Sequence, residues 1–494
     1  MKIPYIKAIA AILIGTGLTG CGDKFLETEL PNGVETESAL SSVKNIGYAL
    51  NGTYYNLFYY NFAGNDAIVF GDLAGDVAYW NAKSQHFNQL YQFAVNADFT
   101  MLSEIWTYGY KVADNAARII KAADELRPSL VDEDEIAELD RLEAEAYALR
   151  GYAQLMLTNI FAHQIKVDGT DFSSMPGIVI IDEPKQPYEQ VSRSTVGESY
   201  AAIVSDFKAS LSYFDNAGYD AGSLFYMNPA AVNGLLARTY LYMENYSEAS
   251  QAAQQALDIA GISSLVVTPE AYRALYAGDD SNIESFFALA ITPSQNWSAY
   301  SLGTMWSTYG YSPSPWLQSV MASDDCRRAV WGWSGDSTPE TPIFNSGKFI
   351  AYGLGGNPAN ATNYIVNAPE MFLIKAEAAL KGNHDVAAAA GELLPVAMRN
   401  PAIADVADLP AGEDDLMAFI KDERARELFQ EGLRLYDLRR WGAPVNAYAT
   451  GAPAIDWMVR NYNISDLVMP IPNSEINAGY GVSQNEGWSA TLPK

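Results

Sequence analysis

The residue with the most specific chemistry in the sequence is a cysteine near its start. The run Leu18-Thr19-Gly20-Cys21 places an aliphatic residue and two small residues directly before a thiol. This order is typical of a lipobox, in which a peptidase cuts before the cysteine and the thiol takes a diacylglycerol. Residues 1–20 resemble a signal peptide, because a lysine-bearing start precedes an apolar stretch too short to span a bilayer. We therefore expect Cys21 to carry the lipid that anchors the protein; a secretory signal followed by an incidental cysteine is the alternative.

Catalytic residue types are sparse and scattered. The three histidines are His86, His163 and His384, and the sequence contains no HExxH, paired CxxC, GxxxxGK[ST] or GxSxG motif. The 59 acidic residues leave a glycosidase-like pair of carboxylates open, but no spacing singles one out. The sequence therefore predicts a protein that is not an enzyme, and we expect no cofactor and no metal site.

Aromatic residues in two stretches suggest a different chemistry, the binding of sugars. A sugar ring has an apolar face, on which an aromatic ring can stack, and a rim of hydroxyls, which amides and carboxylates can bond. One stretch is rich in Gly and Asp, and the other lies where helical periodicity fades. Burial in the core is the commoner fate of any single aromatic residue. The predicted ligand contacts are Tyr79, Trp80, Asn81, Trp297, Tyr300, Trp306 and Tyr309.

The elements that must position these residues are mainly helices. Apolar periodicity predicts long helices over 102–126, 136–161 and 195–214, with Pro128 ending the first and Thr195 capping the third. The short links between them favour antiparallel helix pairs.

A tetratricopeptide-like unit is expected at residues 229–259, with a weaker echo at 369–398. Its small and large packing residues have the spacing that allows two helices to approach closely. Helices give way to an irregular segment over about 290–355 and return from 369, ending with a helix over 416–436. The packing residues of the unit are Leu236, Ala237, Tyr240, Ala249, Ala253 and Ala256.

Composition limits the possible functions. The chain has 31 basic and 59 acidic residues, so its net charge of −28 excludes a general nucleic-acid role and disfavours anionic ligands. Only Cys21 and Cys326 are present. If Cys21 is lipidated, Cys326 has no intramolecular partner, and we expect it to be a small core residue in a fold that relies on packing.

The chain resembles the SusD/RagB family of outer-membrane nutrient-binding lipoproteins. The most specific matches are three blocks that follow one another near the C-terminus, and weaker matches extend the resemblance over nearly the whole chain. The matching segments are 21–26, 106–115, 143–150, 193–207, 423–428, 431–442, 469–476 and 484–485. We interpret the 423–440 block as structural, with its Arg and Glu residues pairing within a helix and Arg439 and Arg440 suiting the helix dipole.

The resemblance implies a mainly α fold, with tetratricopeptide-like helix pairs supporting a loop-rich portion that binds ligand. It implies a signal peptide at 1–20, an N-terminal helical region at 21–270 and a C-terminal region at 271–494. It further implies lipid anchoring at the outer membrane, and the acidic residues after Cys21 resemble a signal for export to the cell surface. Such proteins cover a SusC-like, TonB-dependent transporter and hand it captured glycans.

Three alternatives remain open at this point. A RagB-like member of the same family would bind peptides or another nutrient. A surface-anchored glycoside hydrolase is the alternative that includes catalysis. The helical surface could also serve mainly as a docking platform for the transporter.

Overall fold

The computed structural model describes most of the chain after its first 38 residues. The predicted signal peptide and Cys21 lie outside the described residues, so their proposed roles remain predictions. The described ranges are 39–219, 222–278, 281–339, 341–349, 355–448, 458–462 and 468–488.

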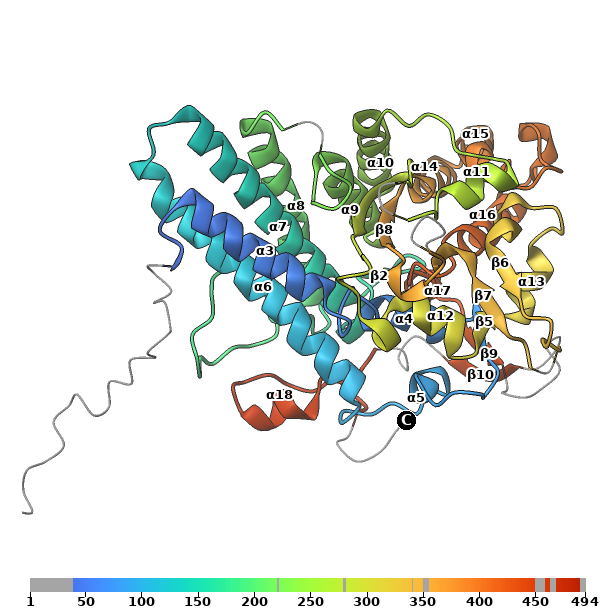
Figure 1. Ribbon diagram of the computed structural model, residues 1–494, viewed down its shortest axis with the longest axis horizontal. Helices are drawn as coiled ribbons and strands as arrows, with labels where there is room; N and C mark the ends of the chain where they lie inside the picture. The colour runs from blue at the N-terminus through green and yellow to red at the C-terminus, as the bar shows by residue number, and fades with distance from the viewer. Residues whose placement is uncertain are drawn as a thin grey trace, which may run out of the picture.

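Long helices lie side by side in the N-terminal half (Figure 1). Three of the four form where the sequence predicts helices, whereas the helix over Val43–Phe58 is not predicted. Three of the four begin at a side-chain cap, and the helix over Thr100–Leu126 begins without one. The Asp132 carboxylate accepts the backbone N–H groups of Asp134 and Glu135, and Thr195 forms a reciprocal capping box with Glu198. The long helices are α3 (Val43–Phe58), α6 (Thr100–Leu126), α7 (Glu133–Phe161) and α8 (Val196–Asn216).

The predicted tetratricopeptide-like unit and its echo are confirmed as two helix pairs. The first is α9 (Pro229–Tyr242) with α10 (Tyr246–Ala260), and the second is α14 (Ala368–Asn383) with α15 (Val386–Ala397). All six packing residues named for the unit are buried, and α10 packs on α14 so that the two pairs share a core.

The last predicted helix, over 416–436, is wrong as a single element. It is divided into α16 (Glu413–Glu427) and α17 (Arg434–Arg440). Gly432 lies between them with a φ of 74°, and a Cβ atom there would lie 2.1 Å from the carbonyl oxygen of Ile68. Only glycine tolerates this close approach, so tertiary packing against Ile68 causes the break between the two helices.

Buried arginine–carboxylate pairs join the C-terminal helices to the rest of the core. Arg327 donates to Glu423 (2.6 Å), and Arg440 donates to Glu377 (2.7 Å). The expected pairing within one helix does occur between Arg426 and Glu423 (2.6 Å). However, most partners come from distant elements, which corrects the interpretation of this block as pairs along a single helix.

Arg439 lies in the last turn of its own helix, as predicted, and also contacts another helix. Its guanidinium donates to the carbonyl oxygens of Asn159 and Ala162 (2.5 Å for Ala162), at the C-terminal end of α7. These are carbonyls that the helix itself leaves without partners. Arg439 therefore completes the end of α7 and fixes α17 against it.

Short strands and helices make up the segment over about 290–355 that the sequence predicts as irregular, and others lie between the longer helices elsewhere in the chain. Strands pair two by two in antiparallel fashion: β1 (Ala78–Trp80) with β5 (Tyr311–Pro313), β2 (Lys166–Val167) with β3 (Thr170–Asp171), β4 (Ser285–Leu289) with β8 (Asn363–Asn367), β6 (Trp331–Trp333) with β7 (Phe344–Ser346), and β9 (Val445–Tyr448) with β10 (Met458–Tyr462). The short helices are α4 (Asp66–Leu73), α5 (Asn88–Tyr91), α11 (Pro269–Ala274), α12 (Leu302–Thr308), α13 (Pro315–Val320) and α18 (Asn473–Ala478). The 3₁₀ turns are Arg127–Ser129, Ser298–Tyr300, Cys326–Val330, Gly347–Phe349, Pro358–Asn360 and Val406–Asp408.

One large hydrophobic core draws on both halves of the chain, from Ile46 on α3 to Trp488 near the end of the described residues. Cys326 is buried as predicted, and burial raises the pKa of its thiol to about 12. In the described ranges, no helix combines the length and the apolar character needed to cross a bilayer.

Candidate ligand-binding site

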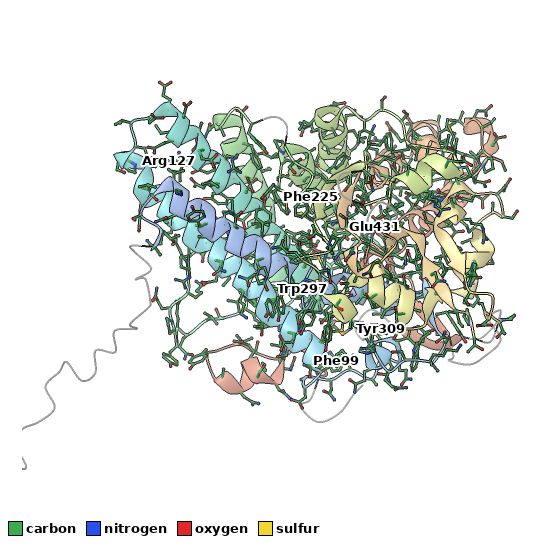
Figure 2. All side chains as sticks on the ribbon, in the orientation of Figure 1. Phe99, Arg127, Phe225, Trp297, Tyr309 and Glu431 are labelled. Atoms are coloured by element: carbon green, nitrogen blue, oxygen red, sulfur yellow. The ribbon has the colours of Figure 1, made fainter. Side chains whose placement is uncertain are left out.

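A cluster of aromatic rings lies where the end of α3 meets α6 and the segment after β4. We call this cluster the aromatic platform, and Figure 2 shows its central residue, Trp297. Residues that are far apart in sequence meet here, because α3 packs on α6 and Tyr300 of the 3₁₀ turn Ser298–Tyr300 stacks on Tyr60, just after α3. The platform consists of Tyr55, Phe58, Tyr59, Tyr60, Tyr108, Trp297 and Tyr300.

Trp297 is the central ring of the platform. Its ring centroid lies 4.7 Å from that of Tyr59 and 5.2 Å from that of Phe58. Its indole Nε1–H donates a 2.8 Å hydrogen bond to the carbonyl oxygen of Phe58. The hydrogen bond satisfies the indole N–H, and the ring itself packs against Tyr59 and Phe58.

A side-chain amide holds the turn that presents Trp297. The Oδ1 atom of Asn296 accepts the backbone N–H of Ser298 (2.9 Å), and its Nδ2 group donates to Asn360 (3.2 Å). Ser298 has a φ of 49°, a conformation that needs such support in a residue other than glycine. Asn296 is therefore engaged within the protein.

Two tyrosines give the platform its accessible surface. Tyr300 is 53 % exposed and stacks on Tyr60, with ring centroids 4.7 Å apart. Tyr55 is 55 % exposed and lies 5.9 Å from Trp297. Each ring is held by a neighbour within the platform and still presents surface to solvent, which is the geometry that a stacked ligand requires.

Two phenol groups of the platform, those of Tyr60 and Tyr108, stay protonated at neutral pH. Desolvation, followed by the neighbouring Tyr59, raises the pKa of Tyr108 to about 12. Desolvation also raises the pKa of Tyr60, with Tyr59 and Asp66 adding to the effect. Lys111 places its ammonium 4.1 Å from the centre of the Tyr108 ring, a cation–π contact. The platform therefore offers neutral O–H groups beside its ring faces.

Tyr309 lies next to the platform and is partly buried. Its ring stacks on His86 with centroids 4.0 Å apart, and its hydroxyl donates to the carbonyl oxygen of Ala299 (2.6 Å). Burial, and then the neighbouring Tyr300, raises the pKa of this phenol. Of the predicted ligand contacts, Trp297, Tyr300 and Tyr309 are therefore brought together.

The other four predicted contacts are packed inside the protein. Tyr79, Trp80, Asn81 and Trp306 are between 1 % and 4 % exposed. Strand β1 carries Tyr79 and Trp80 against β5, and the Asn81 amide donates to the carbonyl oxygen of Pro342 (2.6 Å). The Trp306 ring lies against Phe429 with centroids 5.0 Å apart.

The structure thus places these four side chains in the core, with no ring face open to a ligand. The physical reason is that β1–β5 pairing and α12 packing enclose the aromatic residues that the sequence shows only as a local cluster.

Sequence reasoning did not identify the platform residues on α3 and α6. Tyr55, Tyr59, Tyr60 and Tyr108 carry no motif, and their role depends on helix packing. One signal was available: Phe58-Tyr59-Tyr60 is a run of three consecutive aromatic residues, more than one buried face needs.

A small polar cavity of about 210 Å³ adjoins the platform. The backbone N–H of Asp66 donates to the carbonyl oxygen of Tyr60 (2.8 Å), and Glu104 precedes Tyr108 by one turn of α6. Burial, and then the nearby Glu104, raises the pKa of Asp66 to about 8. The residues that line this polar cavity are Asn61, Asp66, Gln85, Phe87, Asn88, Gln89, Phe99, Thr100, Met101 and Glu104.

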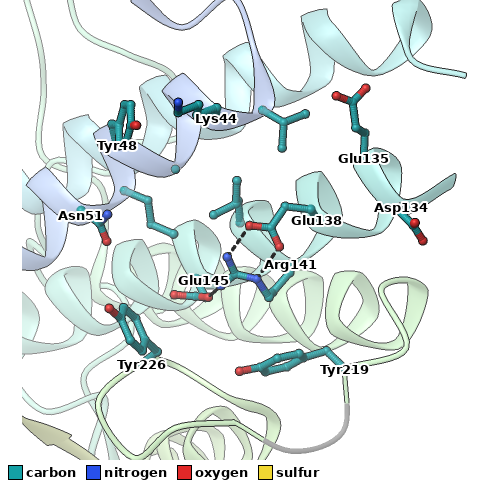
Figure 3. A pocket seen from close by; sticks show the side chains of 14 residues that line it. Lys44, Tyr48, Asn51, Asp134, Glu135, Glu138, Arg141, Glu145, Tyr219 and Tyr226 are labelled. Carbon is teal, nitrogen blue, oxygen red and sulfur yellow. Dashed lines mark hydrogen bonds and ion pairs between the residues drawn. The ribbon is translucent and has the colours of Figure 1, made fainter. Parts of the chain in front are cut away.

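A larger groove of about 670 Å³ lies elsewhere, between α3 and α7 (Figure 3). Tyr48 and Tyr226 are exposed within it. Its charged groups are largely paired with one another, since Arg141 bonds both Glu138 and Glu145. The described residues contain no group of three or more His, Cys, Asp or Glu side chains placed to hold a metal ion.

Two family models match the chain. Residues 24–241 match a model described as starch-binding and associating with the outer membrane, and residues 357–488 match the model of the SusD family. No curated protein matched the chain.

Solved structures resemble the chain over nearly its full length. A SusD superfamily protein from Bacteroides thetaiotaomicron is 24 % identical, with a TM-score of 0.78 over 90 % of this chain and 99 % of that one. A protein from Bacteroides vulgatus, named as a candidate sugar binding protein, is 25 % identical, with a TM-score of 0.79 over 91 % of this chain and 100 % of that one. A SusD-like carbohydrate binding protein from Bacteroides vulgatus is 19 % identical, with a TM-score of 0.72 over 92 % of this chain and 98 % of that one.

Proposed function

Because the chain belongs to the SusD family, we propose that it binds an oligosaccharide on the aromatic platform and passes it to an outer-membrane transporter. The observation that carries this proposal is the exposed, supported ring of Tyr300, stacked on Tyr60 beside Trp297. A ring held on one side and open on the other can stack on the apolar face of a sugar at little cost in side-chain entropy.

The platform is suited to more than one sugar unit. Tyr55 and Tyr300 are both exposed. The ring of Tyr55 lies against Trp297, and the ring of Tyr300 stacks on Tyr60, which itself contacts Trp297. Two open rings in one cluster can each stack a sugar face, and protonated phenols beside them can donate to sugar hydroxyls. Trp297 positions Tyr55 directly and Tyr300 through Tyr60. Tyr309, which stacks on His86, bonds Ala299 beside Tyr300.

We further propose that Cys21 carries a lipid anchor and that the protein faces the outside of the cell over a SusC-like, TonB-dependent transporter. The family description of outer-membrane association supports this placement. Tethering keeps a binding protein at high effective concentration beside its transporter, whereas a diffusing protein would be diluted. In this proposal the protein captures and delivers the glycan without cleaving it.

The experiment that tests this function is titration of the purified protein with a panel of oligosaccharides, followed by calorimetry and by Trp fluorescence. Saturable binding without product release supports the proposal. Cleavage of a bound glycan would favour the hydrolase alternative, and binding of peptides alone would favour the RagB-like alternative.

A further inference from the structure

The polar cavity contains an oxygen atom that has no hydrogen-bond donor. Asn61 is only 7 % exposed, and its Oδ1 atom has no partner within the described structure. Asn61 lines the cavity and directly follows Tyr60 of the platform. A buried acceptor without a partner is energetically unfavourable, so this oxygen atom is available to accept a hydrogen bond from a ligand that enters the cavity.

Two carboxyl groups share the cavity with Asn61. Asp66 is 8 % exposed and Glu104 is partly buried, and no ion pair or side-chain hydrogen bond within the described ranges engages either group. Several other buried carboxylates of this protein have a cation partner: Glu370 accepts from Arg238 (2.7 Å). Asp66 and Glu104 therefore stand out as acceptors that the fold itself does not use.

The remaining lining residues supply no positive charge. None of the ten residues that line the cavity is Lys, Arg or His. The amide of Asn88 is occupied by Gln85, to which it donates at 2.6 Å. A ligand group that carries both positive charge and several N–H donors would satisfy the carboxyl groups and the Asn61 oxygen together.

We propose that this cavity receives a protonated amino group of the glycan bound on the platform, so that the protein prefers oligosaccharides with free amines, of the glucosamine type. This inference rests on the proposed glycan-binding function and names the ligand class for that site. The stacked rings of Tyr60 and Tyr300 hold the sugar. The cavity, which is lined by Asn61 directly after Tyr60, binds the amine.

The ionisation of Asp66 provides a signature of amine binding. Burial, and then Glu104 on α6, keeps the pKa of Asp66 at about 8. Tyr60 is a titratable neighbour, whose pKa is raised by burial and then by Tyr59 and Asp66. Asp72, the other buried carboxyl of α4, is engaged elsewhere, since it accepts the backbone N–H of Gln430 (2.7 Å). A bound ammonium favours the ionised form of Asp66, so binding should release a proton near neutral pH.

Calorimetry with defined ligands tests this inference. The ligands are a glucosamine tetramer, its fully N-acetylated counterpart, and a lysine-containing peptide. The wild type should bind the free-amine tetramer about tenfold or more tightly than the acetylated one. The affinity for the free-amine tetramer should rise between about pH 5 and pH 7, and the binding enthalpy should depend on buffer ionisation because a proton is released.

Variants locate the preference within the cavity. The double variant Asp66→Asn with Glu104→Gln should lose the preference for the free amine while retaining affinity for the acetylated tetramer. Asn is close in shape to the protonated acid, so the fold should be preserved. Glu125→Gln on the same helix is the matched control, since Glu125 is exposed and pairs with Lys121, away from the cavity.

The outcomes separate the two proposals. Equal affinity for both tetramers, or a preference that survives the double variant, overturns the amine inference and leaves glycan binding intact. Preference for the lysine peptide over both tetramers overturns the proposal that the amine bound in the cavity belongs to a glycan. Failure of every glycan to bind overturns the proposed function itself.

Discussion

The indole nitrogen of Trp297 donates a 2.8 Å hydrogen bond to the backbone carbonyl of Phe58, 239 residues earlier in the chain. This bond joins the segment after β4 to the end of α3. It places the central ring of the platform against Tyr55 and Tyr60, and the exposed Tyr300 stacks on Tyr60. A loop-borne ligand surface thereby gains the rigidity of a helix.

Removing the central ring should weaken binding, whereas replacing a buried core indole by a smaller ring should affect stability alone. Trp297→Ala should weaken glycan affinity by about tenfold or more, because Tyr55 and Tyr59 lose the ring that orients them. Trp306→Phe, which changes a buried tryptophan outside the platform, should lower thermal stability and leave affinity unchanged. Calorimetric titration and melting curves measure the two effects. Equal loss of affinity in both variants would show that Trp297 acts only through stability.

A buried arginine should be essential for stability. Arg327→Met leaves Asp325, Glu423 and Glu427 together in the core without their shared cation. Breaking a buried pair in this way costs about 3–5 kcal/mol. Denaturant unfolding monitored by circular dichroism should show this loss, while Lys121→Met, at an exposed pair, should change stability by about 1 kcal/mol or less. A loss for Arg327→Met no larger than that of the control would contradict this prediction.

Stability should fall as pH rises from about 5 to about 8. Burial raises the pKa of Asp66 to about 8 and that of Asp72 to about 7, so the folded state holds protons that the unfolded state has already released. The free energy of unfolding therefore decreases over this interval. Asp66→Asn should flatten the decrease, and the control Asp98→Asn, at an exposed residue, should not. A profile that is flat in the wild type would contradict the assignment of these raised pKa values.

The lipid anchor is tested separately from the binding site. Cys21→Ala should abolish incorporation of labelled palmitate and weaken nutrient uptake by whole cells, because the protein leaves the membrane. Glycan affinity of the purified domain should be unchanged. Equal labelling of wild type and variant would contradict lipidation at Cys21.

The helices could be predicted from sequence because their signals are local. Apolar periodicity and caps such as Thr195 act within a few residues, and α8 begins directly after Thr195 as predicted. The division of the last helix at Gly432 could not be predicted in this way, because its cause is the carbonyl of Ile68, more than 300 residues distant in sequence.

The candidate site was predicted only in part, for the same reason. Trp297 and Tyr300 were identified because they lie in a segment without helical periodicity. Trp80 and Trp306 lie in similar local contexts, yet strand pairing and packing enclose them. The tyrosines of α3 and α6 become a surface only when the two helices meet, which no local pattern records.

The most direct test of glycan binding at the platform compares two exposed tyrosines. Tyr300 lies on the platform, and Tyr48, the control, lies on α3 in the separate groove of Figure 3. Calorimetric titration with a glycan that binds the wild type should show affinity reduced about tenfold or more in Tyr300→Ala and unchanged in Tyr48→Ala. Unchanged affinity in a folded Tyr300→Ala variant, or no binding of any glycan by the wild type, would contradict the proposal.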